Sequence, residues 1–151
     1  MAEFEVDIAA NCELWRGYEE GLCRVLAAAA SSEQVGGVVS LLLGDDAGIA
    51  ALNKEFRGKD GPTNVLSFPP APTPDGGSDE SFLGDIAMAA ETIAAEAQFQ
   101  GKSFADHSAH IAVHGFLHLL GYDHMNDSDA EVMERKERAI LTSIGISDPY
   151  A

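Results

Sequence analysis

The alternation of apolar and polar residues along the chain predicts four short strands. Phe4, Val6 and Ile8 alternate with acidic residues, and a period of two is typical of a strand that buries one face. Three further runs rich in β-branched and apolar residues predict strands at 38–43, 64–68 and 82–88. Between the last two, residues 69–81 (PPAPTPDGGSDES) are dominated by Pro, Gly, Ser and Asp, which predicts a mobile surface loop.

Apolar residues recur with a helical period near 3.6 elsewhere in the chain, most of all in its C-terminal half. The expected helices are 12–30, 45–56, 91–100, 103–120 and 128–145. Asp45 and Ser103 are candidate N-caps, and Ser128 with Glu131 matches a capping box. We expect one domain over residues 1–151, an α+β fold in which a small mixed four-stranded sheet packs with about five helices.

The composition fits a globular protein in a reducing compartment. Apolar residues make up 46% of the 151 residues, and no apolar run approaches the roughly 18 residues of a membrane span. The N-terminal MAEFEVD lacks the basic and apolar layout of a secretion signal, and the two cysteines are expected to be reduced and buried. We therefore expect a cytoplasmic protein with no membrane contact. The net charge of −16 argues against nucleic acid as a partner, but only weakly, because electrostatic fields are local.

Histidines carry the clearest chemical signal. His114 and His118 lie four residues apart in an apolar helical run, so they differ by only ~40° around the helix axis. Gly121 is a helix stop, and His124 follows it closely enough to fold back as a third ligand. Three nitrogen ligands and an open position are typical of a catalytic zinc ion rather than a structural one. We predict one zinc ion held by these three residues.

Two further histidines, His107 and His110, lie on the same helix face, within an arc of about 80°. His110 could pair with His114 as well, but the pair of His114 and His118 lies nearer the turn that delivers His124. We therefore expect His107 and His110 to line a cleft or to bond the ligands, with His110 a candidate for substrate binding. Asp123 is expected to be a turn residue, although ligation stays open, and Asp85 could hydrogen-bond a ligand imidazole.

The histidine pair matches half of the H-E-x-x-H zinc motif of metalloproteases. The position after the first histidine is Gly115 instead of glutamate, so the general base of a peptidase is missing. A second group of residues follows in FRGKDGPTNVLSFP, residues 56–69, where a turn into a strand places Arg57 and Lys59 on a loop. Arginine offers a planar fork suited to phosphate oxygens, which makes Arg57 the catalytic candidate and Lys59 a substrate-binding one.

These residues resemble the YbeY endoribonuclease family of bacteria. The matching stretches are NKEFRGKDGPTNVLSFP, LGDIAM, HSAHIAVHGFLHLLGYDH and ILTSIGISDPY. The resemblance implies a zincin-like α+β fold, with His114, His118 and His124 as zinc ligands and Arg57 important for activity. It also implies a role in maturing the 3′ end of 16S ribosomal RNA and in ribosome quality control. Ribosomal RNA and small-subunit ribosomal proteins would be the partners.

Three functions are therefore open. The first is a zinc-dependent endoribonuclease specific for single strands. The second is a metalloprotease-like hydrolase, which the glycine at position 115 disfavours. The third is a ribosome assembly factor with a mainly structural metal, for which Asp123 or His110 would have to close the fourth position. Imidazole ligands suit zinc, copper, nickel and iron alike, so the sequence leaves the metal open, as it does the oligomeric state.

Overall fold

The computed structural model describes residues 3–70 and 82–150, and its four strands form one mixed sheet. The strands are β1 (Phe4–Ala10), β2 (Gly37–Gly44), β3 (Val65–Phe68) and β4 (Phe82–Ala89). Their order is β1-β2-β4-β3, with β1, β2 and β4 parallel and β3 antiparallel to β4. The predicted mixed four-stranded sheet is confirmed. Most of the predicted loop at 69–81 lies outside the described residues.

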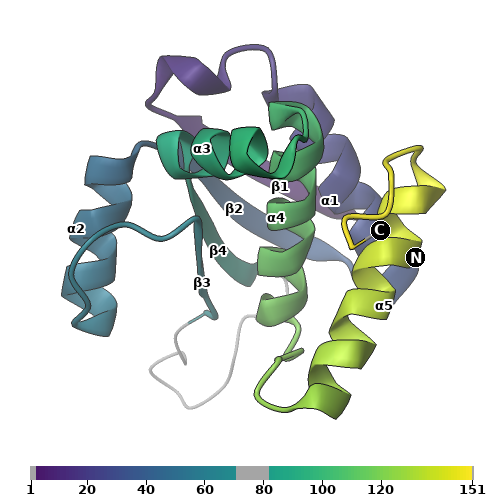
Figure 1. The fold of residues 1–151 in the computed structure, drawn as a ribbon. Coiled ribbons are helices and arrows are strands. Elements are labelled where there is room, and N and C mark those ends of the chain that lie inside the picture. Colours follow the sequence, from purple (N-terminus) through teal and green to yellow (C-terminus); the bar gives the residue numbers. More distant parts are fainter. Residues whose placement is uncertain (1–2, 71–81, 151) are drawn as a thin grey trace, which may run out of the picture.

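Five α-helices and one short 3-10 helix are present in the described part of the chain (Figure 1). The 3-10 helix is η1 (Glu13–Trp15), and the α-helices are α1 (Glu19–Glu33), α2 (Asp46–Arg57), α3 (Ala90–Gln100), α4 (Phe104–Leu119) and α5 (Asp127–Ser143). None of the helices in 3–70 and 82–150 combines the length and the apolar character needed to cross a bilayer.

The strands bury both faces of the sheet, because alternate side chains point to opposite sides. On β2, Leu41 and Leu43 join the core beneath α1 and α4, whereas Leu42 packs with Ile49 of α2 on the other face. Figure 1 shows α2 set apart from α4 and α5, with the strands between them. The edge strand β3 thus lies between α2 and α4, which pack on opposite faces, so the two predicted functional groups meet around the β3 edge of the sheet.

Two helix beginnings differ from the prediction. The helix expected from Cys12 starts at Glu19, because the chain first forms η1 and then turns at Gly17, whose φ of +90° is in the left-handed region. The last helix is capped by Asn126 and not by Ser128: the side-chain oxygen Oδ1 of Asn126 accepts a hydrogen bond of 2.8 Å from the Asp129 backbone N–H. Asp45 and Ser103 cap α2 and α4 as predicted.

Gly121 ends helix α4. Gly121 has a φ of +99°, and its N–H donates to the His118 carbonyl while the Tyr122 N–H donates to that of Leu117. This pair of bonds is a Schellman motif, which satisfies the last carbonyls of the helix and reverses the chain. The helix stop predicted at Gly121 is confirmed, and it directs the following residues back toward the last turn of α4.

Candidate metal centre

The three predicted ligands converge. The Nε2 atoms of His114 and His118 are 3.0 Å apart, and one ring nitrogen from each of His114, His118 and His124 lies within 4.8 Å of the others. Nitrogens bound to one tetrahedral zinc ion at about 2.0–2.1 Å are roughly 3.3 Å apart. The spacing of the rings therefore fits a single ion with little movement, and all three side chains offer imidazole nitrogens, which are common zinc ligands.

Neither residue suggested as a fourth ligand joins this cluster. The Asp123 carboxylate accepts a hydrogen bond of 2.7 Å from the His124 backbone N–H, so it is a turn residue as expected. The His110 ring points to Glu137, with its Nε2 3.0 Å from Oε2. Among the His, Cys, Asp and Glu side chains that the structure describes, the three histidines form the one group able to hold an ion. A bound ion would keep a position open for solvent or substrate.

Glu137 of α5 contacts one of the candidate ligands and was not among the site residues predicted from the sequence. Its side chain is fully buried, and its Oε2 accepts hydrogen bonds from His110 and from Nδ1 of His114, the latter at 3.3 Å. Its Oε1 accepts a hydrogen bond of 2.6 Å from the Tyr150 hydroxyl. The signal was present in the spacing, because Glu137 falls four residues after Met133 and three before Ile140, on the buried face of α5.

The buried carboxylate of Glu137 is ionised. Burial by itself raises its pKa, but the hydrogen bonds from His110, His114 and Tyr150 outweigh burial and lower the pKa to about 2. An ionised carboxylate can only accept hydrogen bonds, so His114 donates through Nδ1–H and keeps the lone pair of Nε2 for a metal. The pKa of Tyr150 is raised by burial and by the hydrogen bond to Glu137, so Tyr150 remains a neutral donor.

His118 also favours its neutral form. Burial lowers its pKa, and the neighbouring rings of His114 and His124 lower it further. A metal ligand must be unprotonated, so both influences prepare this side chain to bind an ion near neutral pH.

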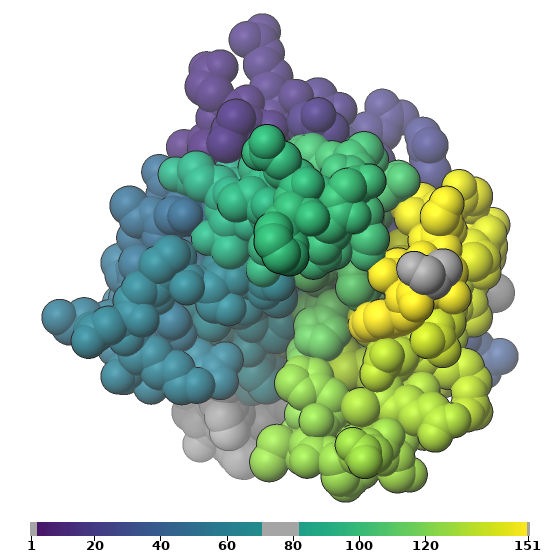
Figure 2. All heavy atoms as spheres, viewed as in Figure 1, coloured from purple at the N-terminus to yellow at the C-terminus, as the bar shows by residue number. Residues whose placement is uncertain are grey.

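A cleft of about 540 Å³ opens beside the histidines, and it contains Arg57. Its lining combines the ends of α2 and β3 with α4 and the turn that follows: Arg57, Thr63, Asn64, Val65, Ser67, Pro69, His114, His118, Asp123, His124 and Met125. Figure 2, drawn from the same side as Figure 1, shows the blue residues of α2 and β3 meeting the green residues of α4 and its following turn. Arg57 lies at the C-terminal end of α2, which stops at Gly58 with a φ of +67°.

The other predicted site residues lie outside this cleft lining. Lys59 is exposed on the loop after α2. His110 instead borders a separate pocket of about 50 Å³ near the C-terminus. Asp85 is exposed on β4, and among the described residues no hydrogen bond joins it to a histidine. The predicted substrate contacts of Lys59 and His110 thus stay predictions, and His110 reaches the metal ligands through Glu137.

His107 is buried and belongs to a second chain of polar groups, whose other members are half-buried. Its Nε2 lies 2.9 Å from Oε1 of Glu96, which also accepts a hydrogen bond of 3.2 Å from the amide of Asn64. Asn64 is part of the cleft wall, so Glu96 connects α3 and α4 to the beginning of β3. Like His110, His107 does not line the cleft; it contacts the cleft residue Asn64 only through Glu96.

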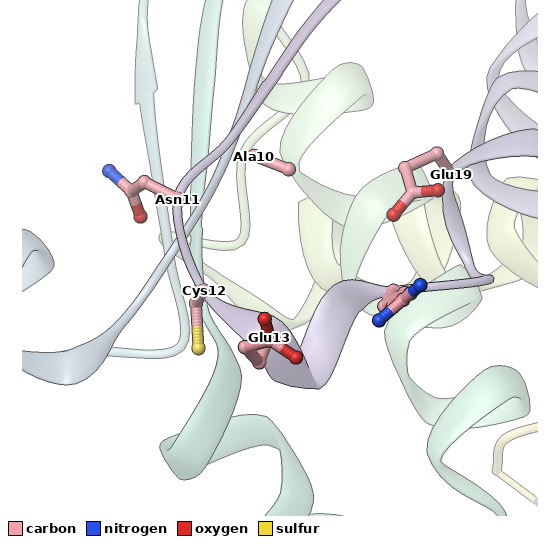
Figure 3. A pocket seen from close by; sticks show the side chains of 6 residues that line it. Ala10, Asn11, Cys12, Glu13 and Glu19 are labelled. Carbon is pink, nitrogen blue, oxygen red and sulfur yellow. The ribbon is translucent and has the colours of Figure 1, made fainter.

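A separate hollow of about 330 Å³ lies where β1 meets η1 (Figure 3). Its lining includes the carboxylates of Glu13 and Glu19, the guanidinium of Arg16 and the thiol of Cys12. Both cysteines are free, but they are half-buried and not buried as expected. None of these side chains joins a described cluster able to hold a metal, so the chemistry is assigned to the histidine cleft.

Comparison with known proteins agrees with the resemblance seen in the sequence. The family model described as "Endoribonuclease YbeY" matches residues 8–145. Proteins named endoribonuclease YbeY include one from Parvibaculum lavamentivorans, 58% identical over 117 residues that cover 73% of this chain and 63% of that protein. One from Rhizobium etli is 49% identical over 99% of this chain and 95% of its own length.

The fold is also found in a solved structure. The solution structure of TM1509 from Thermotoga maritima aligns over 97% of this chain and 99% of its own, with a TM-score of 0.58 and 24% identity. At this identity the likeness concerns the fold alone. The matched family model and the relatives at about half identity over most of the chain decide the family, and the chain belongs to the endoribonuclease YbeY family.

Proposed function

We propose that this protein is a zinc-dependent endoribonuclease specific for single strands, acting in the maturation of the 3′ end of 16S ribosomal RNA and in ribosome quality control. The observation that carries the proposal is the shared cleft. Three converging imidazoles with room for a further ligand and the guanidinium of Arg57 line the same hollow. The names of the relatives support cleavage of RNA. Ribosomal RNA and small-subunit ribosomal proteins would be the partners, in the cytoplasm.

Phosphodiester cleavage places new negative charge on the phosphate oxygens in the transition state. When bound, a zinc ion supplies a Lewis acid next to that phosphate. Arg57 offers a second positive group, whose planar fork matches two phosphate oxygens. Glu137 holds His114 in the form that donates through Nδ1, and Asp123 orients the backbone at His124.

The size of the cleft supports a single-stranded substrate. A volume of about 540 Å³ is within the range of small-ligand sites, so it accepts one or two nucleotides and not a helix. An unpaired strand can bend one phosphate into the cleft, whereas the phosphates of an A-form duplex stay on the outside of a wide cylinder. The overall charge of −16 repels RNA, so we expect contact to be confined to the region of Arg57.

The two alternatives each meet an obstacle. A peptidase of the H-E-x-x-H class needs a glutamate at position 115, but a Cβ there would already lie 3.0 Å from Val65 Cγ2 and 3.2 Å from Ile86 Cγ2. A purely structural metal needs a fourth protein ligand, and Asp123 and His110 both face other partners.

The test compares purified variants on matched substrates. We expect the native protein to bind one equivalent of zinc and to cut a single-stranded RNA but not its duplex. Arg57→Ala should keep the zinc and lose about 10²–10³-fold in the rate of cleavage, the range for a group that stabilises the transition state. His118→Ala should lose both zinc and cleavage. Equal cleavage by both variants would identify a contaminating nuclease. In cells depleted of the protein, we expect 16S RNA with unprocessed 3′ ends to accumulate.

A further inference from the structure

We propose that Tyr150, acting through Glu137, positions the metal ligand His114, so that the C-terminal segment 148–150 sets the metal affinity of the site. The inference rests on the proposed metal site. Tyr150 and Glu137 would be positioning residues, since neither lines the cleft. The geometry is a relay of two hydrogen bonds, 2.6 Å from Tyr150 to Glu137 and 3.3 Å from His114 to the same carboxylate.

The carboxylate at the centre of this relay has no access to solvent. Glu137 is 0% exposed, and both of its oxygens are occupied by donors from three side chains. A buried charge is tolerated only when its hydrogen bonds are made, so each donor restricts where the carboxylate can lie. Glu137 therefore holds His114 in one ring orientation and in one tautomer, which a surface carboxylate could not do.

His110 completes this arrangement. Its Nε2 lies 3.0 Å from Glu137 and 3.2 Å from the Tyr150 hydroxyl, while its Nδ1 is buried without a partner. The proton is therefore placed on Nε2, where there is an acceptor, and the partnerless Nδ1 carries only a lone pair. His110 thus directs its one donor to the carboxylate, as His114 does one helical turn later.

The C-terminal segment is anchored at several points, so the Tyr150 hydroxyl is delivered to a defined place. Asp148 accepts hydrogen bonds from the Tyr150 backbone N–H at 2.8 Å and from Arg138 at 3.2 Å. Lys102 donates to the Pro149 carbonyl at 2.8 Å, and the Arg138 guanidinium lies 5.2 Å from the centre of the Tyr150 ring. Figure 2 shows the yellow C-terminal residues packed between α5 and the green end of α3.

Removing the Tyr150 hydroxyl should therefore weaken metal binding. Without Tyr150 as a donor, Oε1 of Glu137 is left buried and unpaired. Because an unpaired buried oxygen is costly, the carboxylate should rotate toward other donors and away from His114. Partners that orient a metal ligand typically contribute 10–100-fold in metal affinity. We expect Tyr150→Phe to weaken zinc binding about 10-fold and Glu137→Gln about 100-fold.

The experiment uses the full chain and two readouts. Zinc affinity is measured by competition with a chromophoric chelator, at a temperature where circular dichroism shows that every variant is folded. The tautomer of His114 is read from ¹⁵N–¹H spectra of the metal-free protein, where the native chain should show Nδ1–H. Glu131→Gln is the matched control, because Glu131 is an exposed carboxylate on the same helix that pairs only with Arg135 among the described residues. It should change neither readout.

The outcomes separate the two proposals. Weaker zinc binding by both variants, with loss of the Nδ1–H tautomer in Glu137→Gln, supports the relay. Native affinity in Tyr150→Phe, or an unchanged tautomer in Glu137→Gln, overturns it. If Glu137→Gln fails to fold, Tyr150→Phe decides alone, since it deletes one oxygen at a half-exposed ring. A native protein that binds no zinc but shows the Nδ1–H tautomer would defeat the metal site and leave the positioning of His114 standing.

Discussion

Ser67 donates a hydrogen bond of 2.8 Å from its hydroxyl to the carbonyl oxygen of Gly115, joining the edge strand β3 to α4 beside the first metal ligand. The contact is possible because the helix approaches the sheet closely at a residue without a side chain. It fixes β3, and with it one wall of the cleft, against the helix that carries two of the histidines.

Gly115→Ala should destabilise the protein. Its Cβ would lie 3.0 Å from Val65 Cγ2 and 3.2 Å from Ser67 Oγ, closer than ordinary van der Waals contact, so these side chains must move by a few tenths of an ångström in a packed interface. Overpacking of this kind costs about 1–3 kcal/mol, which urea denaturation would measure. Gly21→Ala in α1 is the matched control, since its Cβ meets nothing within 4 Å and should stabilise the helix by about 0.5–1 kcal/mol. Equal effects of the two substitutions would contradict the close approach.

The cap of α5 can be tested in the same way. Asn126→Ala removes the acceptor for the Asp129 N–H and should cost about 1 kcal/mol of unfolding free energy. Ser128 lies inside the first turn of α5, so Ser128→Ala should change the free energy of unfolding by less than about 0.5 kcal/mol. A larger loss of stability in Ser128→Ala than in Asn126→Ala would instead support the capping box predicted from the sequence.

The histidine trio was predictable because all of its determinants are local. Helical spacing aligns His114 with His118, and a glycine in the left-handed region turns the chain toward His124. The role of His110 was only partly predictable. Its distance from the turn before His124 excludes it from the trio, but only the packing of α5 against α4 reveals that its ring bonds to Glu137.

Glu137 was hidden by its neighbours. Arg135, Lys136 and Arg138 suggest a solvated face, and their ion pairs with Glu131, Glu33 and Asp148 are at least partly exposed. Burying a carboxylate on such a helix costs folding free energy unless hydrogen-bond donors lie next to it. Two of those donors come from α4 and one from the C-terminus, so the tertiary fold alone reveals why the residue is inside.

His107 should make stability depend on pH. Burial lowers its pKa from the ordinary 6.5, although the hydrogen bond to Glu96 opposes this. Below about pH 6.5 the unfolded chain takes up a proton that the folded chain resists, so stability falls as the pH decreases, by at most about 1.4 kcal/mol per pH unit. Urea denaturation between pH 5 and 8 would show a shallower slope for His107→Gln. An unchanged slope would mean that other groups carry the dependence.

Zinc should stabilise the native protein but not His124→Ala. A ligand that binds only the folded state adds RT ln(1 + [L]/Kd), about 2.7 kcal/mol when the free ion is at 100 times its Kd. His124 is exposed on the turn after α4, so its removal deletes a ligand while leaving the core intact. The metal-free proteins should therefore unfold within about 0.5 kcal/mol of one another. Thermal unfolding with a buffered zinc series measures both quantities. A zinc-dependent rise of equal size in the variant would place the stabilising ion elsewhere on the chain, and an unequal metal-free stability would show that His124 has a structural role of its own.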